Sequence, residues 1–171
     1  FKELGIGEVR GVQLAFGGLI GGLQARRFDV IAAGMFITPE RCGQVAFSDP
    51  EYVAQNAFLV PKGNPKGIRR FEDAAKSGAR IGVLTGAVEA GYAEKLGVAK
   101  SNIKTFEDQP SAFEGLEAER IDAVALTRIS LADTLSKHEG APFEITEPFV
   151  PVIDGKEQLG AGGFAFRRQD A

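Results

Sequence analysis

The sequence has few of the residues that build covalent cross-links, metal centres or membrane spans. Its 171 residues include one cysteine, one histidine, one methionine and no tryptophan. One cysteine excludes an internal disulfide, and one cysteine with one histidine supplies too few ligands for a metal cluster. We therefore expect no metal site, and nothing in the sequence points to another cofactor.

The single cysteine, Cys42, and the single histidine, His138, do not suggest catalysis. A nucleophilic thiol needs a base beside it. Cys42 falls inside a short predicted helix, where we expect a small buried residue. His138 lies in the polar stretch "SKHEGAP", where we expect a solvated loop residue. Cys–His chemistry is therefore not predicted, and no catalytic residue is assigned.

Charge and hydropathy exclude two further classes of protein. The net charge is −3, and the lysines and arginines are scattered, so the basic footprint of a nucleic-acid-binding protein is missing. The sequence also lacks a run of about 18 apolar residues, the length that a membrane-spanning helix needs. With 44% hydrophobic and 25% charged residues, the composition is typical of a globular domain.

What the sequence does contain is an alternation of strand and helix patterns. Two prolines and two glycines in residues 61–70 mark a boundary, and a regular series follows it. The predicted helices are 71–78, 87–97, 109–121 and 128–140, and the predicted strands are 79–86, 102–108 and 122–127. Before the boundary we expect strands at 8–16, 28–35 and 56–63, with helices at 17–29 and 39–45; strands at 143–152 and 162–170 return to this first unit. Apolar strands alternating with helices predict an α/β fold with parallel-dominated sheets flanked by helices.

The first junction that suggests a site is "GMFITPERC". Thr38 is a good N-cap and Pro39 suits the first helical position, so a helix should begin there with Arg41 in its first turn. A cation in that turn opposes the helix dipole, and an anionic ligand would explain it. Phe36, just before the helix, would then cover a flat or cationic group.

Two later junctions place polar side chains at strand ends. Glu89 falls in the first turn of the helix after "IGVLTG", where it either meets a ligand or simply favours the helix dipole. The stretch "TGAVEAG" lacks the Gly-Lys-Ser/Thr ending of a phosphate loop, so a nucleotide site is not predicted. Thr127 ends another predicted strand, where ligands bind in open parallel sheets, and it is equally suited to cap the next helix.

The two ends of the chain suggest a piece of a longer protein. The sequence starts at "FKELGIGEV" without an initiator methionine or signal peptide, and it stops at "FRRQDA" just after a predicted strand. We expect truncation at both ends, with strand edges left without partners.

Several stretches, taken together, resemble a known family. "FGGLIGGLQARRFDVIAAGMFITPERCGQVAFSDPEY" resembles the solute-binding proteins of polar amino acid ABC importers, and "FLVPKGNP", "FEDAAKSGARIGVLTGAVEAGYA" and "RIDAVALT" continue the resemblance in order. It covers nearly the whole chain. The finer similarity, which includes "GAGGFAFRRQD", is to the ectoine- and hydroxyectoine-binding branch of that family.

The resemblance implies two α/β lobes of the type II periplasmic-binding-protein kind, joined by two crossing hinge strands. Lobe 1 would comprise residues 1–59 and 147–171 and would be incomplete, since family members have further segments at both ends. Lobe 2 would comprise residues 60–146.

The resemblance also implies roles for individual residues. Arg41 would grip a ligand carboxylate with its planar fork. Phe36 and Phe16 would form aromatic walls against a delocalised cation such as the amidinium of ectoine. Glu89 would accept a hydrogen bond from a ligand N–H or hydroxyl group.

Two positions bear on the kind of ligand. Val88 stands where related proteins often have threonine, so only its backbone N–H would serve the ligand. Thr127 matches the position at which binders of ordinary α-amino acids usually place an aspartate for the α-ammonium group. Threonine there favours a ligand without a free primary ammonium, and ectoine is such a ligand.

The resemblance therefore implies a periplasmic or lipid-anchored extracellular protein that is not an enzyme. It would capture a small zwitterionic compatible solute by lobe closure and deliver it, as a monomer, to the membrane permease of an ABC transporter. A polar or basic amino acid is the rival ligand. A periplasmic dehydratase, for which Glu89 is the one candidate acid, and a sensory domain would share the same fold.

Overall fold

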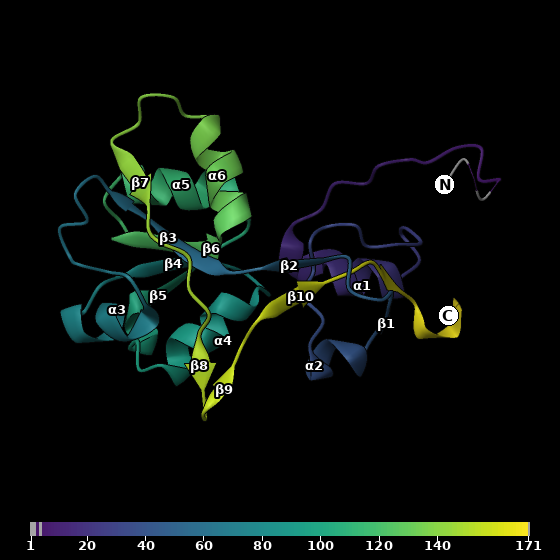
Figure 1. Ribbon diagram of the computed structural model, residues 1–171. Coiled ribbons are helices and arrows are strands. Elements are labelled where there is room, and N and C mark those ends of the chain that lie inside the picture. The colour runs from purple at the N-terminus through teal and green to yellow at the C-terminus, as the bar shows by residue number, and fades with distance from the viewer. Residues whose placement is uncertain (1–2, 4, 171) are drawn as a thin grey trace.

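The computed structural model describes residue 3 and residues 5–170, and these form two lobes (Figure 1). We call residues 56–145 the sheet lobe, and residues 16–54 together with 160–170 the small lobe. In the described part of the chain, no helix has both the length and the apolar character needed to cross a membrane.

A five-stranded mixed sheet organises the sheet lobe. Its strands are β3 (Asn56–Pro61), β4 (Ile81–Leu84), β5 (Ile103–Phe106), β6 (Ala123–Thr127) and β7 (Phe143–Ile145), in the order β5-β4-β6-β3-β7. The strands β5, β4 and β6 are parallel, as expected, but β3 and β7 join the sheet through antiparallel pairs. The expectation of a parallel-dominated sheet therefore holds for its βαβ part, since β3 enters from the small lobe and runs against the parallel strands.

Helices cover both faces of this sheet (Figure 1). They are α3 (Phe71–Ser77), α4 (Val88–Lys95), α5 (Gln109–Glu117) and α6 (Arg128–Ser136), and a short 3₁₀ turn, η3 (Lys100–Asn102), precedes β5. One buried cluster, centred on Phe58 and Phe71, lies under α3 and α4, and another, centred on Phe113 and Leu131, lies under α5 and α6. The predicted helices of this lobe are thereby confirmed, each within a few residues of its expected ends.

The small lobe is made of short elements. These are η2 (Phe16–Gly18), α1 (Leu19–Gln24), α2 (Pro39–Cys42), β1 (Ala46–Phe47), β2 (Tyr52–Ala54), β10 (Gly160–Gly162), β11 (Ala165–Phe166) and η4 (Arg168–Asp170). The strands form two antiparallel pairs, β1 with β11 and β2 with β10, so the predicted return of residues 162–170 to the first unit is confirmed. The predicted strand at 143–152 does not return to this lobe, because its first residues form β7, which pairs with β3 in the sheet lobe. One cluster of six buried residues, which includes Leu23 and Ile31, forms the core.

Two strands expected in the first unit are corrected. Residues 8–15 have no regular structure and are exposed, because no described strand pairs with them. In residues 28–35 only Ile31 forms a ladder contact, a single bridge to Ala165. Alternating apolar residues are compatible with a strand, but a strand also needs a neighbour to satisfy its backbone groups.

Two expectations about single residues are also wrong. Cys42 is exposed rather than buried, because the single turn of α2 points Arg41 inward and the next residue outward. His138 is not a free loop residue: its ring stacks on Phe113 with centroids 3.8 Å apart, and its Nδ1 lies 2.8 Å from the carbonyl oxygen of Thr134.

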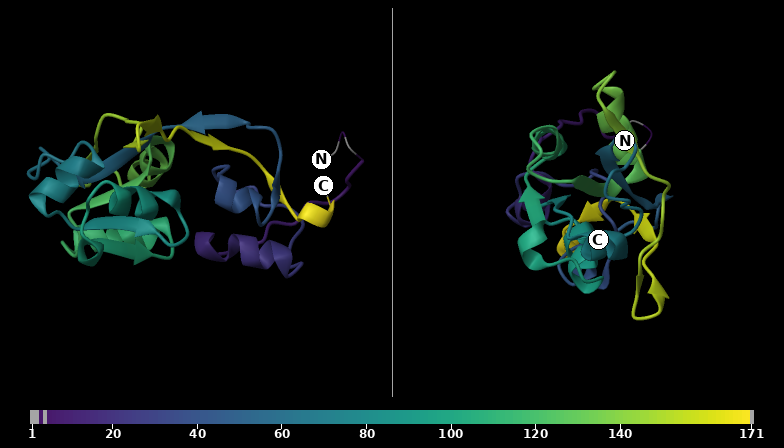
Figure 2. Two further views of the ribbon diagram at one scale, coloured as in Figure 1. Left: turned by 90° about the horizontal axis from the view of Figure 1, so that it is seen from below. Right: turned by 90° about the vertical axis from the view of Figure 1, so that its left-hand side faces the viewer.

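Two chain segments connect the lobes, along one side of the molecule (Figure 2). β2 leads directly into β3, while the return path runs from β7 through a hairpin of β8 (Val152–Ile153) and β9 (Lys156–Glu157) into β10. Asn56 and Phe149 tie the two segments together through a pair of backbone hydrogen bonds. The boundaries of lobe 1 (1–59 and 147–171) and lobe 2 (60–146) stay a proposal; the sheet itself begins at Asn56.

Candidate functional site

A cavity of about 330 Å³ lies between the lobes. It brings together all six residues singled out in the sequence, three from each lobe: Phe16, Phe36, Arg41, Val88, Glu89 and Thr127. The rest of its wall is Ala33, Gly34, Tyr52, Ala54, Leu84, Ala87, Gln109, Leu126, Ile129 and Ser130. A mostly apolar cavity of this size with a few convergent polar groups suits a small molecule.

Arg41 is the basic group of this site. The predicted start of α2 is confirmed: Pro39 is its first residue, and the Thr38 hydroxyl accepts a hydrogen bond from the Arg41 backbone N–H at 3.2 Å. However, α2 is a single turn, so Arg41 belongs to its last turn as well, and the helix dipole does not by itself call for an anionic ligand here.

The Arg41 guanidinium is nevertheless held in an unusual place. It is buried, with 8% of its surface exposed, and it donates to the carbonyl oxygens of Phe36 at 2.7 Å and of Gly86 at 2.8 Å. Burial lowers the pKa of Arg41 from its ordinary value, and Glu89 opposes that shift. Two of its five side-chain donors are used on these carbonyls, so its other donors are unengaged by the described residues and suit a carboxylate.

Phe16 and Phe36 are related to Arg41 in different ways. The guanidinium carbon lies over the Phe16 ring, 5.6 Å from its centroid, so in this structure the cation facing Phe16 is Arg41 itself. Phe36 is buried, and its ring centroid lies 6.3 Å from that of Tyr52. Phe36 and Tyr52 thus form a second aromatic surface of the cavity.

Glu89 is the acidic group of the site. It lies in the first turn of α4, as expected, with 3% of its surface exposed. Burial raises the pKa of Glu89 to about 7, while its own backbone N–H and the charge of Arg41 act in the opposite direction. A buried carboxylate with so little compensation is well suited to a cationic or N–H-bearing group of a ligand.

Val88 begins α4 and Thr127 ends β6, both in the sheet lobe. Val88 is the first residue of α4 and lines the cavity. Thr127 caps α6: its hydroxyl accepts from the Ser130 backbone N–H at 3.2 Å and donates to the Ser130 hydroxyl at 2.9 Å. The capping role of Thr127 is confirmed, and its predicted role toward a ligand stays a prediction.

Sequence reasoning missed three polar residues of the wall: Tyr52, Gln109 and Ser130. Tyr52 was within reach, because it is the tyrosine of the "FSDPEY" stretch that contributes to the family resemblance. Gln109 and Ser130 are early residues of helices, where a cap is the simplest explanation of a polar side chain, so no separate signal marked them.

The two lobes also approach each other closely through backbone at Gly17 and Gly86. A β-carbon added to Gly86 would lie 2.8 Å from the Cα of Gly17, and one added to Gly17 would lie 3.0 Å from the carbonyl oxygen of Thr85. With the Arg41–Gly86 hydrogen bond, these contacts hold the lobes together in this structure.

The polar groups of the wall are suited to binding a charged ligand. The wall offers one guanidinium, one carboxylate, hydroxyls and aromatic rings, but no cysteine, histidine or lysine. Among residues 3 and 5–170, no group of three or more His, Cys, Asp or Glu side chains is placed to hold a metal. The fold and the cavity define a two-lobed α/β protein that binds a small molecule between its lobes.

The chain belongs to the bacterial extracellular solute-binding proteins, family 3, whose model matches residues 1–105. It is 39% identical over 173 residues to a probable amino-acid ABC transporter periplasmic-binding protein of Sinorhizobium fredii (strain NBRC 101917 / NGR234), with 99% of this chain and 57% of the relative covered. It is 30% identical over 159 residues to the lysine/arginine/ornithine-binding periplasmic protein of Escherichia coli (strain K12), with 91% and 59% covered. The chain thus spans less than two thirds of these relatives.

Solved structures agree on the fold. A crystal structure of EhuB in complex with hydroxyectoine superposes with a TM-score of 0.87 at 36% identity, covering 98% of this chain and 64% of that one. An ancestral arginine-binding protein bound to arginine superposes with a TM-score of 0.82 at 33% identity, covering 98% and 70%. The periplasmic-binding-protein-like fold is thereby confirmed, and the family is one of binding proteins rather than enzymes.

Proposed function

We propose that this chain is the ligand-binding part of a periplasmic solute-binding protein that captures a small zwitterion and delivers it to the permease of an ABC transporter. The lobes close on the solute, and the closed form is the one the permease receives. The proposal includes an extracytoplasmic location and a monomeric protein, and it involves no catalytic step.

The observation that carries this proposal is the pairing of opposite charges in one cavity. Arg41, from the small lobe, is buried with donors to spare, and Glu89, from the sheet lobe, is a buried carboxylate with a raised pKa. A ligand that brings a carboxylate to Arg41 and a cation to Glu89 compensates both desolvated charges at once. Because the two groups belong to different lobes, such a ligand also favours closure.

We propose ectoine or hydroxyectoine as the solute. Each carries a carboxylate and a delocalised amidinium, and neither has a primary ammonium group. Phe36, beside Tyr52, provides an aromatic face for a delocalised cation, and Phe16, over which Arg41 lies, lines the same cavity. Thr127 lines the cavity with a neutral hydroxyl that is already used to cap α6, which is a poor partner for an ammonium group. The similarity to EhuB in complex with hydroxyectoine supports the same ligand class.

A basic amino acid is the second candidate, and Glu89 is the observation that favours it. A buried carboxylate can pair with a guanidinium as well as with an amidinium. The similarity to an arginine-binding protein bound to arginine points the same way.

Thermal unfolding of the full chain with and without added solute tests the proposal. Millimolar ectoine, hydroxyectoine, arginine, glycine betaine and prephenate are compared one by one. A solute present at about 100 times its dissociation constant stabilises the folded state by about 2.7 kcal/mol, a rise of several degrees in Tm.

A rise with ectoine or hydroxyectoine that Arg41→Ala abolishes is the expected result. A rise with arginine alone would keep the transport function and overturn the ectoine assignment. No rise with any zwitterion, or a rise with prephenate alone, would contradict the proposed function.

A further inference from the structure

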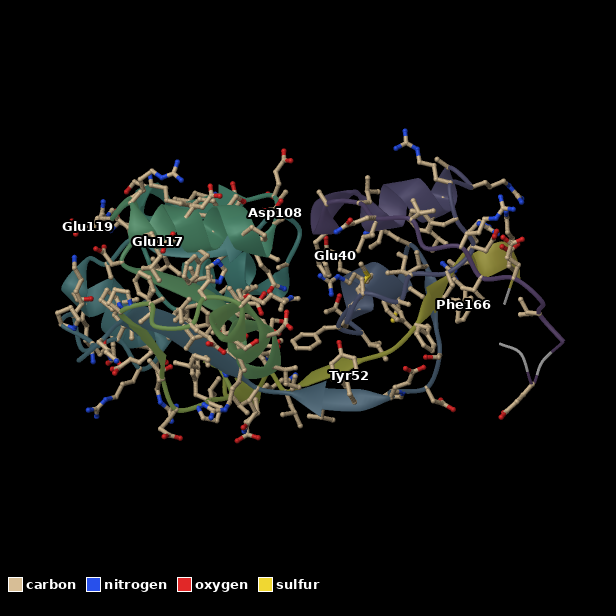
Figure 3. The ribbon with its side chains drawn as sticks, turned by 90° about the horizontal axis from the view of Figure 1, so that it is seen from above. Glu40, Tyr52, Asp108, Glu117, Glu119 and Phe166 are labelled. Atoms are coloured by element: carbon tan, nitrogen blue, oxygen red, sulfur yellow. The ribbon has the colours of Figure 1, made fainter. Side chains whose placement is uncertain are left out.

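Tyr52 brings an unpartnered polar group to the cavity. Its ring lines the wall, and its hydroxyl is buried without a hydrogen-bond partner among the described residues. A buried hydroxyl without a partner costs free energy, so such groups in native proteins usually have a ligand or an ordered water to bind. Figure 3 shows Tyr52 beside β10, where the two lobes meet.

Two glycines of β10 determine where this ring lies. Gly162 is directly opposite Tyr52 in the β2–β10 pair, and a β-carbon on Gly162 would overlap the Tyr52 ring and hydroxyl. Gly160, two residues earlier on the same face of the strand, would overlap the Phe36 ring in the same way. The aromatic rings therefore lie against bare backbone, in space that any other residue at 160 or 162 would fill.

A third glycine borders the hydroxyl itself. A β-carbon on Gly34 would lie 3.3 Å from the Tyr52 hydroxyl oxygen, and Gly34 has a positive φ of 64°. Gly34 also lines the cavity. The hydroxyl is thus held between the backbone of residues 34 and 162, close to the cavity and shielded from bulk water.

The surroundings keep this hydroxyl neutral. Burial raises the pKa of Tyr52 above its ordinary value, and Arg41, Glu51 and Glu89 are the charged groups near enough to act on it. A neutral phenol carries one O–H donor, and a solute carboxylate held by Arg41 would bring acceptor oxygens into the same region.

We propose that Tyr52 is a specificity-determining residue, whose hydroxyl donates a hydrogen bond to an oxygen of the bound solute. Gly162 holds the Tyr52 ring in place, and Gly160 holds the Phe36 ring. The inference rests on the proposed function. It adds a selection rule: solutes with an oxygen acceptor beside the aromatic surface are preferred over solutes of the same shape without one.

The test compares Tyr52→Phe with the wild-type chain by calorimetric titration of ectoine, hydroxyectoine and arginine. The substitution removes one oxygen and keeps the ring, so the fold should be retained, as far-UV circular dichroism would show. We expect affinity for the preferred solute to fall about tenfold, the typical effect of losing one hydrogen bond to a ligand. Unchanged or tighter binding by Tyr52→Phe would overturn the inference.

Glycine variants test the second half of the proposal. Gly162→Ala and Gly160→Ala should weaken binding at least as much as Tyr52→Phe, because each displaces a ring. Gly21→Ala is the matched control: a β-carbon there meets nothing within 4 Å, so binding should not change. If Gly160→Ala and Gly162→Ala fold and bind as tightly as Gly21→Ala, the positioning role is wrong.

The two proposals fail in different ways. If the wild-type chain binds none of these solutes, the proposed function is contradicted. If the wild-type chain binds one of them and Tyr52→Phe binds it equally well, only the role of Tyr52 is contradicted.

Discussion

The sheet lobe buries hydrophobic side chains on both faces of a five-stranded sheet, whereas the small lobe buries a single cluster between short elements. In the core of the sheet lobe, the rings of Phe58 and Phe71 pack edge to face, and Phe149 of the connecting segment packs against both. In the small lobe, Arg167 supplements the core by donating to the Phe28 carbonyl oxygen at 2.8 Å and to the Asp29 carboxylate at 2.7 Å. Hydrophobic burial dominates in one lobe, and polar links contribute more in the other.

The same difference appears in what each lobe gives to the cavity. The sheet lobe contributes residues at the ends of its strands and the starts of its helices, namely Val88, Glu89 and Thr127, whose positions follow from the sheet. The small lobe contributes Arg41 and the aromatic side chains, whose positions depend on glycines and carbonyl groups around them. Regular elements thus position the cavity residues of the sheet lobe, whereas irregular local contacts position those of the small lobe.

The largest expected effect comes from the core of the sheet lobe. Phe58 is fully buried between Phe71 and Phe149, so Phe58→Ala should lower the free energy of unfolding by about 3–5 kcal/mol. Leu23→Ala, in the small lobe, should lower the free energy of unfolding by only ~2 kcal/mol, because short elements around a small cluster can partly collapse into the space that the leucine side chain leaves. Urea unfolding measures both.

Amide hydrogen exchange then distinguishes the stability of the two lobes. Leu23→Ala should speed exchange in the small lobe and leave β3, β4 and β6 protected, whereas Phe58→Ala should speed exchange in both. Val53→Ala serves as the surface control, since Val53 is 55% exposed. If Leu23→Ala deprotects the sheet lobe as strongly as Phe58→Ala does, the sheet lobe is not the self-supporting part.

The next prediction concerns Glu89, the buried carboxylate in the cavity between the lobes. The carboxyl has a pKa of about 7 in the folded protein and 4.5 ordinarily, so the folded protein binds this proton more tightly than the unfolded chain. Its contribution to stability is fully present below about pH 4.5 and is lost as the pH rises through 7. Without solute, Glu89→Gln should therefore be the more stable protein near pH 8, by on the order of 3 kcal/mol, and the difference should shrink toward acid.

Glu94→Gln is the control for this prediction. Glu94 lies on the same helix but is exposed and pairs with Lys100, so its substitution should change stability little at any pH. Thermal unfolding across the pH range gives the comparison. A Glu89→Gln variant that is less stable than wild type near pH 8 would show that Arg41 compensates the carboxylate fully. The same variant should bind a cation-bearing solute more weakly. The Glu89 carboxylate would thus lower the stability of the solute-free protein and raise its affinity for the solute.

How much of this could be predicted from the sequence differed between the lobes. The alternation of apolar strands with capped helices after residue 70 is a local signal, and it predicted the βαβ part of the sheet well. In residues 8–16 and 28–35 the same kind of pattern was misleading, since pairing depends on which other strands are present. Local periodicity indicates what a segment is able to form, and its neighbours decide whether it does.

The site shows the same limit. Arg41 and Glu89 were predictable because a cap, a helix start and a strand end are visible within a few residues of each. The position of the Tyr52 ring in the site was not, because it depends on Gly160 and Gly162, more than a hundred residues later in the chain, although the "FSDPEY" stretch marks Tyr52 as part of the family resemblance. A glycine in a strand predicts a close approach of something, but the sequence does not say that a ring fills the space.

The smallest expected effect comes from Asp122, which like Glu89 is a carboxylate of the sheet lobe but is paired within that lobe. Asp122 accepts from the Arg80 backbone N–H at 2.8 Å and from the Arg80 guanidinium at 2.9 and 3.1 Å, and Lys66 lies 3.3 Å away. The hydrogen bonds from Arg80 lower the pKa of Asp122 to about 2, below the ordinary 3.8. The folded protein therefore binds this proton less tightly, so the stability that Asp122 contributes is present above about pH 4 and is lost as the pH falls through 2.

Asp122→Asn should lower the free energy of unfolding by about 1 kcal/mol at neutral pH, since Arg80 and Lys66 are partly exposed and solvent weakens the pair. The loss should vanish between pH 4 and 2, which acid titration of thermal unfolding would detect. Asp133→Asn is the control, because Asp133 and Lys137 are both well exposed and their pair should contribute little. Protonation of the two carboxylates would then change the free energy of unfolding in opposite directions. It would lower the stability at Asp122, whose charge is paired within the sheet lobe, and raise it at Glu89, whose charge lacks a full partner until a solute binds. If Asp122→Asn instead follows the pH dependence of Glu89→Gln, the contrast between a carboxylate paired within the protein and one that needs a solute as its partner does not hold.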